Sequence, residues 1–370
     1  MPAVQEKEVR ITKGYLVLYF CYDIANEIAL DKLEKVLGKK PVAEQLQLKR
    51  IAPEYIQYRA PPVRLKLGGR QVSLDTKKLK FLVDVKLYDF GTVTVRYWLP
   101  LHTPLAQLKH IGSELVENKG LEKDANSIVD RLMADLKEYL VNPTTEHESE
   151  NYAVYYIINF EKKIEAVELL KKHGNTIAAA LCCEERLLSE QELQDSIKTP
   201  LSYYPDDLVI IDWNAAFVYD PSFSYESLDV IEYAVIELLE LRTYDTLLDT
   251  TLEHAYDDLA KHEKHWLFDS HLHRIMHNLS STRLEVTDVI EKVENSLKLF
   301  GDLYLVKVYA AAAARFGLEN WKHSLKDKLD TVMSTYGMLN DKLESRRMLF
   351  LEAIIVALFI IDLIFLYIFG

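Results

Sequence analysis

The sequence predicts an α+β protein: an N-terminal ferredoxin-like α/β sandwich, then a helical bundle or coiled-coil stalk, and one C-terminal transmembrane helix. Three observations lead to this prediction. Alternating apolar residues separated by turn signals fill the first part of the chain, helical periodicity begins near Ser224, and the last residues are almost uniformly apolar. The predicted domains are a cytoplasmic α+β domain over 1–223, a helical bundle or stalk over 224–347, and an anchor over 348–370.

The first domain alternates strand and helix signals along the chain. Strands are expected over 11–21 and 152–160, and hairpins over 78–101 and 205–220. Helices are expected over 25–37, 103–117 and 122–141, and loops over 60–69 and 142–150. The order strand, helix, hairpin, helix, strand suggests the ferredoxin-like arrangement, although open variants are equally consistent with it.

The second domain is helical throughout. Residues 225–262 carry one apolar face, and a histidine-rich helix is expected at about 265–279. Over 318–343, Leu318, Leu325 and Val332 fall seven residues apart, which is the spacing of a coiled-coil seam. The same spacing also fits an ordinary helix partner inside the chain, so both readings stay open.

The C-terminal segment 348–370 is apolar except for Glu352, Asp362 and Gly370. A helix of about 20 apolar residues spans a bilayer core, and Arg346 and Arg347 precede it, so the earlier residues are expected to be cytoplasmic. The expected location is the plasma (inner) membrane, crossed once. Asp362 would lie deep in the bilayer, which favours a contact with another chain, and we take these four charged residues as membrane and assembly sites.

A family resemblance supports the anchor. Leu351-Glu352-Ala353-Ile354-Ile355, followed by Asp362, resembles the "LEWIII…IE" signature of the "required for meiotic nuclear division" family of single-pass membrane proteins. This chain has Ala353 where tryptophan is common, and aspartate in place of glutamate at 362. The resemblance implies an accessory or scaffolding role without catalytic residues, and the N-terminus lacks a transit peptide, so a bacterial-type member is expected.

Composition excludes several classes of function. The net charge is −13, which argues against nucleic acid as the main partner. Three cysteines, two of them adjacent, do not form a disulfide framework and fit a reducing compartment. The sequence lacks the glycine-rich phosphate-binding motifs and the serine nucleophile elbow, so no cofactor is expected.

With those motifs absent, the remaining candidate for a catalytic or ligand-binding site is a metal site on the histidine-rich helix. Asp269, His273 and His277 would share one face of the histidine-rich helix, at i, i+4 and i+8. A solvated polar face is the alternative, because no H-E-x-x-H or C-x-x-C motif accompanies them. The sequence therefore favours a membrane-anchored, non-catalytic scaffold that self-associates and tethers a protein partner. The competing hypothesis is a metal-dependent enzyme built on this helix.

Overall fold

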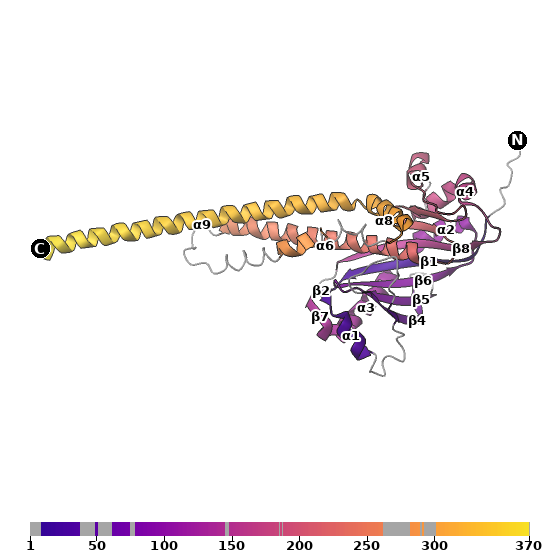
Figure 1. Cartoon of the computed structure of the whole chain (residues 1–370), viewed down its shortest axis with the longest axis horizontal. Coiled ribbons are helices and arrows are strands. Elements are labelled where there is room, and N and C mark those ends of the chain that lie inside the picture. The colour runs from indigo at the N-terminus through magenta and orange to yellow at the C-terminus, as the bar shows by residue number, and fades with distance from the viewer. Residues whose placement is uncertain are drawn as a thin grey trace. The chain divides into compact units, whose positions relative to one another are not determined.

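The computed structural model describes residues 9–37, 49–50, 61–74, 78–144, 148–184, 186, 188–261, 282–288, 291 and 301–369 (Figure 1). The chain divides into two compact units. The first comprises the residues up to Glu240 together with 293–319, and the second comprises 241–292 and 320–370. The predicted domain boundaries at 223 and 347 stay predictions, because a division into compact units does not show which parts of the chain fold as domains.

An eight-stranded sheet forms the centre of the first unit, in the order β3-β4-β5-β6-β1-β8-β10-β9 (Figure 1). Neighbouring strands are antiparallel, except that β10 runs parallel to β8. The strands are β1 (Ile11–Asp23), β3 (Lys49–Arg50), β4 (Val63–Ser73), β5 (Lys78–Leu87), β6 (Thr92–Leu101), β8 (Ser149–Phe160), β9 (Leu208–Ile211) and β10 (Ala215–Tyr219). Two further strands, β2 (Ala25–Ile28) and β7 (Leu140–Pro143), pair with each other.

Most of the predicted strands are confirmed: β1, β8 and the hairpins β5–β6 and β9–β10 all lie where the alternation places them. Two predictions are wrong. The expected loop over 60–69 is mostly strand β4, because its glycines form a bulge: the register shifts there and Gly68 has φ +79°. The expected helix over 25–37 starts only at Leu30, after strand β2.

Three helices cover one face of the sheet. They are α2 (Leu108–Leu115), α3 (Lys119–Leu136) and α4 (Ala166–Leu181). Helix α3 contacts β1, β4 and β6, while α4 contacts α2 and β10. Asn118 caps α3 by accepting hydrogen bonds from the backbone N–H groups of Gly120 and Leu121. The hydrophobic core lies between these helices and alternate residues of the strands, such as Phe20, Val85 and Tyr155.

Two other helices cover the opposite face of the sheet. They are the first half of α6 (Glu226–Lys261), and α8 (Leu303–Arg315). Tyr19 of β1 donates a hydrogen bond to the carbonyl of Leu228, at 3.2 Å. Beyond α8, the Phe316 ring meets the ring of Tyr152 at 5.2 Å between centroids. The unit therefore has three layers, and its sheet is covered on both sides.

The predicted ferredoxin-like sandwich has four strands, whereas this sheet has eight. The structure establishes the coarser statement: a mixed α+β protein with a large sheet and with helices in the C-terminal half. Between β1 and β8 the chain follows the expected order of helix, hairpin and helices, with β3 and β4 added before the hairpin.

The second unit contains the end of α6 and most of α9 (Leu318–Phe369). Lys328 forms ion pairs with Asp245 (2.8 Å) and Asp249 (2.7 Å) of α6, and Ser324 also hydrogen-bonds Asp245. The seam positions Leu325, Leu329, Val332 and Tyr336 are buried within the single chain. An intramolecular helix contact therefore accounts for this part of the heptad pattern, while the side chains of Leu339 and Leu343 lie outside the described residues.

Candidate functional site

Three charged side chains project from β5 and β6 into the layer beneath α6. They are Asp84, Lys86 and Arg96, which are 4%, 2% and 3% exposed. They alternate with core residues such as Val85 and Val95, because successive side chains of a strand point to opposite faces. Antiparallel strands with this pattern usually turn the polar face to water. Here α6 covers it.

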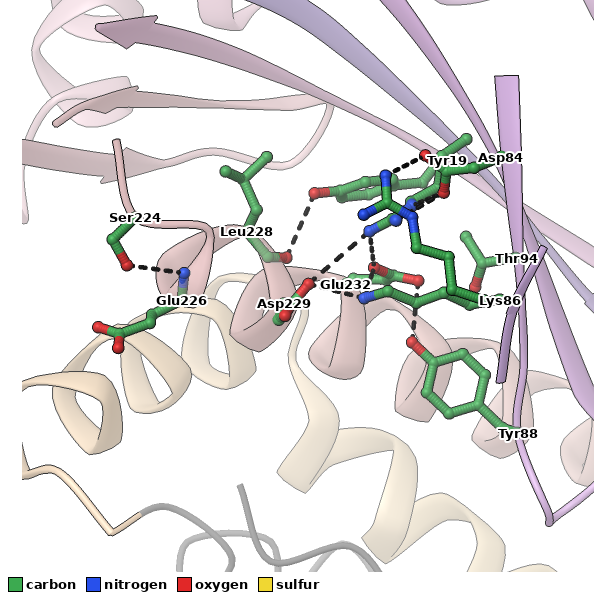
Figure 2. Close-up of polar contacts among 12 residues, drawn as sticks. Tyr19, Asp84, Lys86, Tyr88, Thr94, Ser224, Glu226, Leu228, Asp229 and Glu232 are labelled. Carbon is green, nitrogen blue, oxygen red and sulfur yellow. Dashed lines mark hydrogen bonds and ion pairs between the residues drawn. The ribbon is translucent and has the colours of Figure 1, made fainter. Parts of the chain in front are cut away.

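Helix α6 supplies the matching carboxylates (Figure 2). Asp229 and Glu232 lie three positions apart near its start, so they share one face of the helix. Lys86 Nζ lies 2.6 Å from Asp229 Oδ1 and 2.8 Å from Glu232 Oε2. The hydroxyl of Tyr88 donates a hydrogen bond to Glu232 Oε1 at 2.9 Å. The carboxylate of Glu232 therefore accepts hydrogen bonds from Lys86 and from Tyr88, and its side chain is fully buried.

Asp84, like Glu232, is a carboxylate shared by several donors. Its carboxylate accepts hydrogen bonds from Arg96 Nε at 2.6 Å, from Arg64 Nη2 at 2.6 Å and from Trp98 Nε1 at 2.9 Å. Arg96 Nη1 also reaches Glu232 Oε2 at 3.2 Å, which links the two carboxylates. We call Arg64, Asp84, Lys86, Arg96, Asp229 and Glu232 the buried ion cluster. Its three carboxylates are balanced by its three cations.

The electrostatics favour the charged forms. Burial alone would raise the pKa of the Asp84 carboxyl, but the charges and hydrogen bonds of Arg96 and Arg64 hold that pKa below its ordinary value. Burial would lower the pKa of Arg96, but Asp84, Glu232 and Asp229 hold it well above its ordinary value. Both groups therefore stay ionised at neutral pH, as a buried ion pair requires.

The buried ion cluster joins α6 to the sheet. Each charged group already has a partner of opposite charge, so the cluster offers no free nucleophile, acid or base. Breaking such a buried pair by removing one partner costs about 3–5 kcal/mol, whereas the pair itself adds little net stability over an apolar contact. The arrangement therefore fixes which face of α6 meets the sheet.

A second ionic contact holds the end of α8. Arg315 Nε lies 2.7 Å from Asp212 Oδ1, and its Nη1 lies 2.8 Å from Asp195 Oδ2. Burial would lower the pKa of Arg315, but the hydrogen bonds that it donates to Asp195 and Asp212 raise that pKa overall. Tyr152 donates to the Asp212 carbonyl at 2.7 Å. These contacts connect α8 to the loop between β9 and β10.

None of the residues that the sequence predicts as sites belongs to the buried ion cluster. Arg347, Glu352 and Asp362 are exposed on α9, in the one helix of the described residues that is long and apolar enough to cross a membrane, Arg347–Ile368. The side chain of Arg346 lies outside the described residues. So do Asp269, His273 and His277, the predicted metal ligands. Within the described ranges, no three His, Cys, Asp or Glu residues are grouped to hold a metal.

Sequence reasoning missed the buried ion cluster, although a signal was present. The stretch VIEYAVIELLEL (230–241) is apolar on nearly every side of a helix, which indicates a helix covered all round. Its glutamates must then be buried too, and buried carboxylates need cations. Lys86 and Arg96 were the basic residues at alternating positions of a predicted hairpin that could supply them.

Comparison with known proteins places the chain in a protein family. This chain is an α+β protein whose sheet unit belongs to a recognised family. It belongs to the family described as "Uncharacterized protein MJ0711, N-terminal domain", which matches residues 13–226. The chain is also similar to the uncharacterized protein MJ0711 of Methanocaldococcus jannaschii, with 25% identity over 236 residues, 64% of this chain and 71% of that protein. No solved structure matches.

The family match ends at Glu226, the first residue of α6. It includes Asp84, Lys86 and Arg96 on the strands, but not the carboxylates of α6. The resemblance to the "required for meiotic nuclear division" family rests on the C-terminal segment, which the matched range does not reach, so it stays a prediction.

Proposed function

We propose that this protein is a membrane-anchored, non-catalytic scaffold that self-associates and holds a cytoplasmic protein partner at the membrane. The observation that carries the proposal is the segment Arg347–Ile368, which has 22 residues, a mean hydropathy of 2.8 and no buried part. At 1.5 Å per residue it is about 33 Å long, against about 30 Å for a bilayer core. Insertion in a bilayer removes this apolar surface from water.

The proposed location is the plasma (inner) membrane, with the sheet unit in the cytoplasm. Arg346 and Arg347 support this orientation, because basic residues beside a membrane helix favour the cytoplasmic side. The resemblance to the "required for meiotic nuclear division" family supports the accessory role. The order β8-β1-β6-β5, antiparallel throughout, supports a ferredoxin-like core to which the other strands were added.

Self-association is assigned to the membrane helix. The described seam positions of α9 are already covered within the chain, so they leave less apolar surface for a second copy. Asp362 lies ten residues beyond Glu352, about 15 Å deeper along the helix. A charged aspartate at that depth costs about 2.5–3.5 kcal/mol, and intramembrane carboxyl groups usually face protein, so a neighbouring membrane helix is the proposed partner of Asp362.

Membrane fractionation tests the anchor. The full chain should stay with carbonate-washed membranes, and a chain lacking 348–370 should be released. Placing arginine at both Leu358 and Leu363 should also release it, because each arginine near the bilayer centre costs about 2.5–3.5 kcal/mol. Leu284→Arg, at an exposed position outside this helix, serves as the control. Recovery of the full chain in the aqueous fraction without detergent contradicts the proposal.

The assembly step has a separate test. Asp362→Leu in nanodiscs should reduce the oligomer mass, whereas Ile361→Leu beside it should leave the mass unchanged. Identical masses for both variants and the parent would remove Asp362 from the assembly contact. The competing hypothesis, a metal-dependent enzyme using Asp269, His273 and His277, rests on the sequence alone, and metal analysis of the purified full chain tests it.

A further inference from the structure

A cavity of about 420 Å³ opens on the first unit. None of the residues of the buried ion cluster lines it, although its lining residue Ser227 lies two positions before Asp229 of that cluster on α6. Its walls come from the loop before β9, the turn after β10, the start of α6 and the start of α8. Residues within 203–227 therefore meet the start of α8, which is distant in sequence, around one cavity. Small-molecule sites commonly have volumes of about 300–1,000 Å³, so the cavity has the size of a site for a small ligand.

Tyrosine side chains form one wall of the cavity. The ring of Tyr203 lies 4.8 Å from the ring of Tyr204 and 5.5 Å from that of Tyr304, between centroids. Tyr203 and Tyr204 are each 62% exposed, which is unusual for such large rings in a folded domain. Aromatic faces attract cations through the ring quadrupole.

Carboxylates form the remaining walls. Asp207 accepts from the backbone N–H groups of Tyr203 and Tyr204, and Asp302 caps α8 by accepting from Tyr304 and Leu305. Asp220 likewise holds the turn after β10 by accepting from the N–H groups of Ser222 and Ser224. These bonds fix the positions of three carboxylates but bring no positive charge to them.

The cavity therefore carries uncompensated negative charge. Among the described residues, no lysine or arginine pairs with Asp207, Asp220, Asp302 or Glu226. Asp206 is different, because Lys163 lies 2.7 Å from it. Burial raises the pKa of Glu226 above its ordinary value, and the nearby charges of Asp302 and Asp220 add to this effect. Burial also raises the pKa of Tyr304, and the charges of Asp207, Asp220 and Asp302 add to that effect.

Ser227 gives an independent indication of a ligand. It lines the cavity, it is only 9% exposed, and its hydroxyl has no hydrogen-bond partner among the described residues. Buried polar groups usually have a partner. The Ser227 oxygen is not one of the fully buried atoms that lack a partner, so it is accessible from the cavity that the residue lines, and a ligand there can supply its hydrogen bond. A hydroxyl beside carboxylates is an acceptor suited to an N–H donor.

We propose that this cavity binds a small organic polycation, a linear diamine or polyamine, whose ammonium groups meet the carboxylates and Ser227 while its carbon chain lies against the tyrosines. Four carboxylates without a described lysine or arginine partner line one cavity, so a ligand with two or more positive charges balances them better than a single cation does. The described residues offer no grouping for a metal ion, which favours an organic cation.

The test is a calorimetric titration of spermidine into the full chain in detergent micelles. The expected result is saturable binding near one equivalent that weakens as salt rises. Glu226→Gln and Tyr203→Ala should each weaken it about tenfold, because one removes a charge and the other an aromatic face. Ser227→Ala should weaken it by a smaller factor.

The controls address the net charge of −13, which attracts any polyamine to the surface. Glu190→Gln removes an exposed charge outside the cavity and should leave the affinity unchanged. Butane-1,4-diol, which has the chain length of a diamine without the charges, should not bind. The proposal fails if spermidine does not saturate, or if Glu190→Gln weakens binding as much as Glu226→Gln. None of these results bears on membrane anchoring.

Discussion

The two faces of the sheet are built from the same strands but by opposite chemistry. On the face covered by α2, α3 and α4, the side chains are apolar, as with Phe81, Val85 and Leu87. On the face covered by α6, Asp84 and Lys86 alternate with them and are just as deeply buried. Apolar burial is non-directional, whereas ion pairs require particular partners. The first face therefore supplies cohesion, and the second selects which helix surface docks on it.

Glu232→Ala should have the largest effect of the predicted changes. It leaves Lys86 and Arg96 buried with too little negative charge, so we expect a loss of about 3–5 kcal/mol in the free energy of unfolding. Chemical denaturation of the full chain in mild detergent, with tryptophan fluorescence as the readout, measures this free energy of unfolding. Glu253→Ala, at an exposed position of the same helix, should change stability by less than about 0.5 kcal/mol. Equal losses from the two variants would contradict a special role for the ion cluster.

Leu87→Ala tests the apolar face of the same strand. Leu87 is fully buried, so removing its side chain should cost about 3 kcal/mol through lost transfer energy and a cavity. This loss should be the same at pH 4 and pH 7, since no titrating group is removed. Denaturation at the two pH values measures it, and a loss that halves at low pH would show that the faces are not chemically separate.

Asp84→Asn should cost about 2 kcal/mol at neutral pH, because charged hydrogen bonds to Arg96 and Arg64 are lost. The pKa of Asp84 is lower in the folded chain than in the unfolded chain. Its stabilising contribution is therefore fully present above about pH 4 and is lost as the pH falls through the folded-state value. The difference between the parent and Asp84→Asn should shrink only below about pH 4. A difference that stays constant down to pH 2.5 would contradict the lowered pKa.

Tyr88→Phe should have the smallest effect of the four. It removes the hydrogen bond to Glu232 but leaves the ring in place and keeps Lys86 and Arg96 beside that carboxylate. A loss of about 1 kcal/mol is expected. Thermal unfolding measures it as a small decrease in Tm. A loss as large as that of Glu232→Ala would show that the hydroxyl, and not the cations, holds the carboxylate.

The sequence predicts elements whose pattern is visible within one short segment, and it predicts less well the features that depend on residues elsewhere in the chain. The hairpin β5–β6 followed from alternation and a turn at Asp89–Gly91, and α6 followed from its apolar periodicity. The additional strand β4 did not, because Gly68 and Gly69 look like a loop in the sequence but lie in the strand, next to a bulge between Lys66 and Gly68. The cavity near Tyr203 was also missed, since its aspartates read as turn residues, and Asp207 and Asp220 do hold turns there.

By itself the sequence determined what depends on near neighbours: strands β1 and β8, the hairpins β5–β6 and β9–β10, the long helix α6 and the apolar helix Arg347–Ile368. Only the tertiary structure decided that the charged face of the sheet is buried. Lys86 meets Asp229 and Glu232 across 143 and 146 positions of chain. Local patterning predicts that a lysine in an alternating strand faces water. Here that expectation is wrong, because a helix distant in sequence covers the lysine and supplies carboxylates that compensate its charge. The periodicity of one segment carries no information about such a partner.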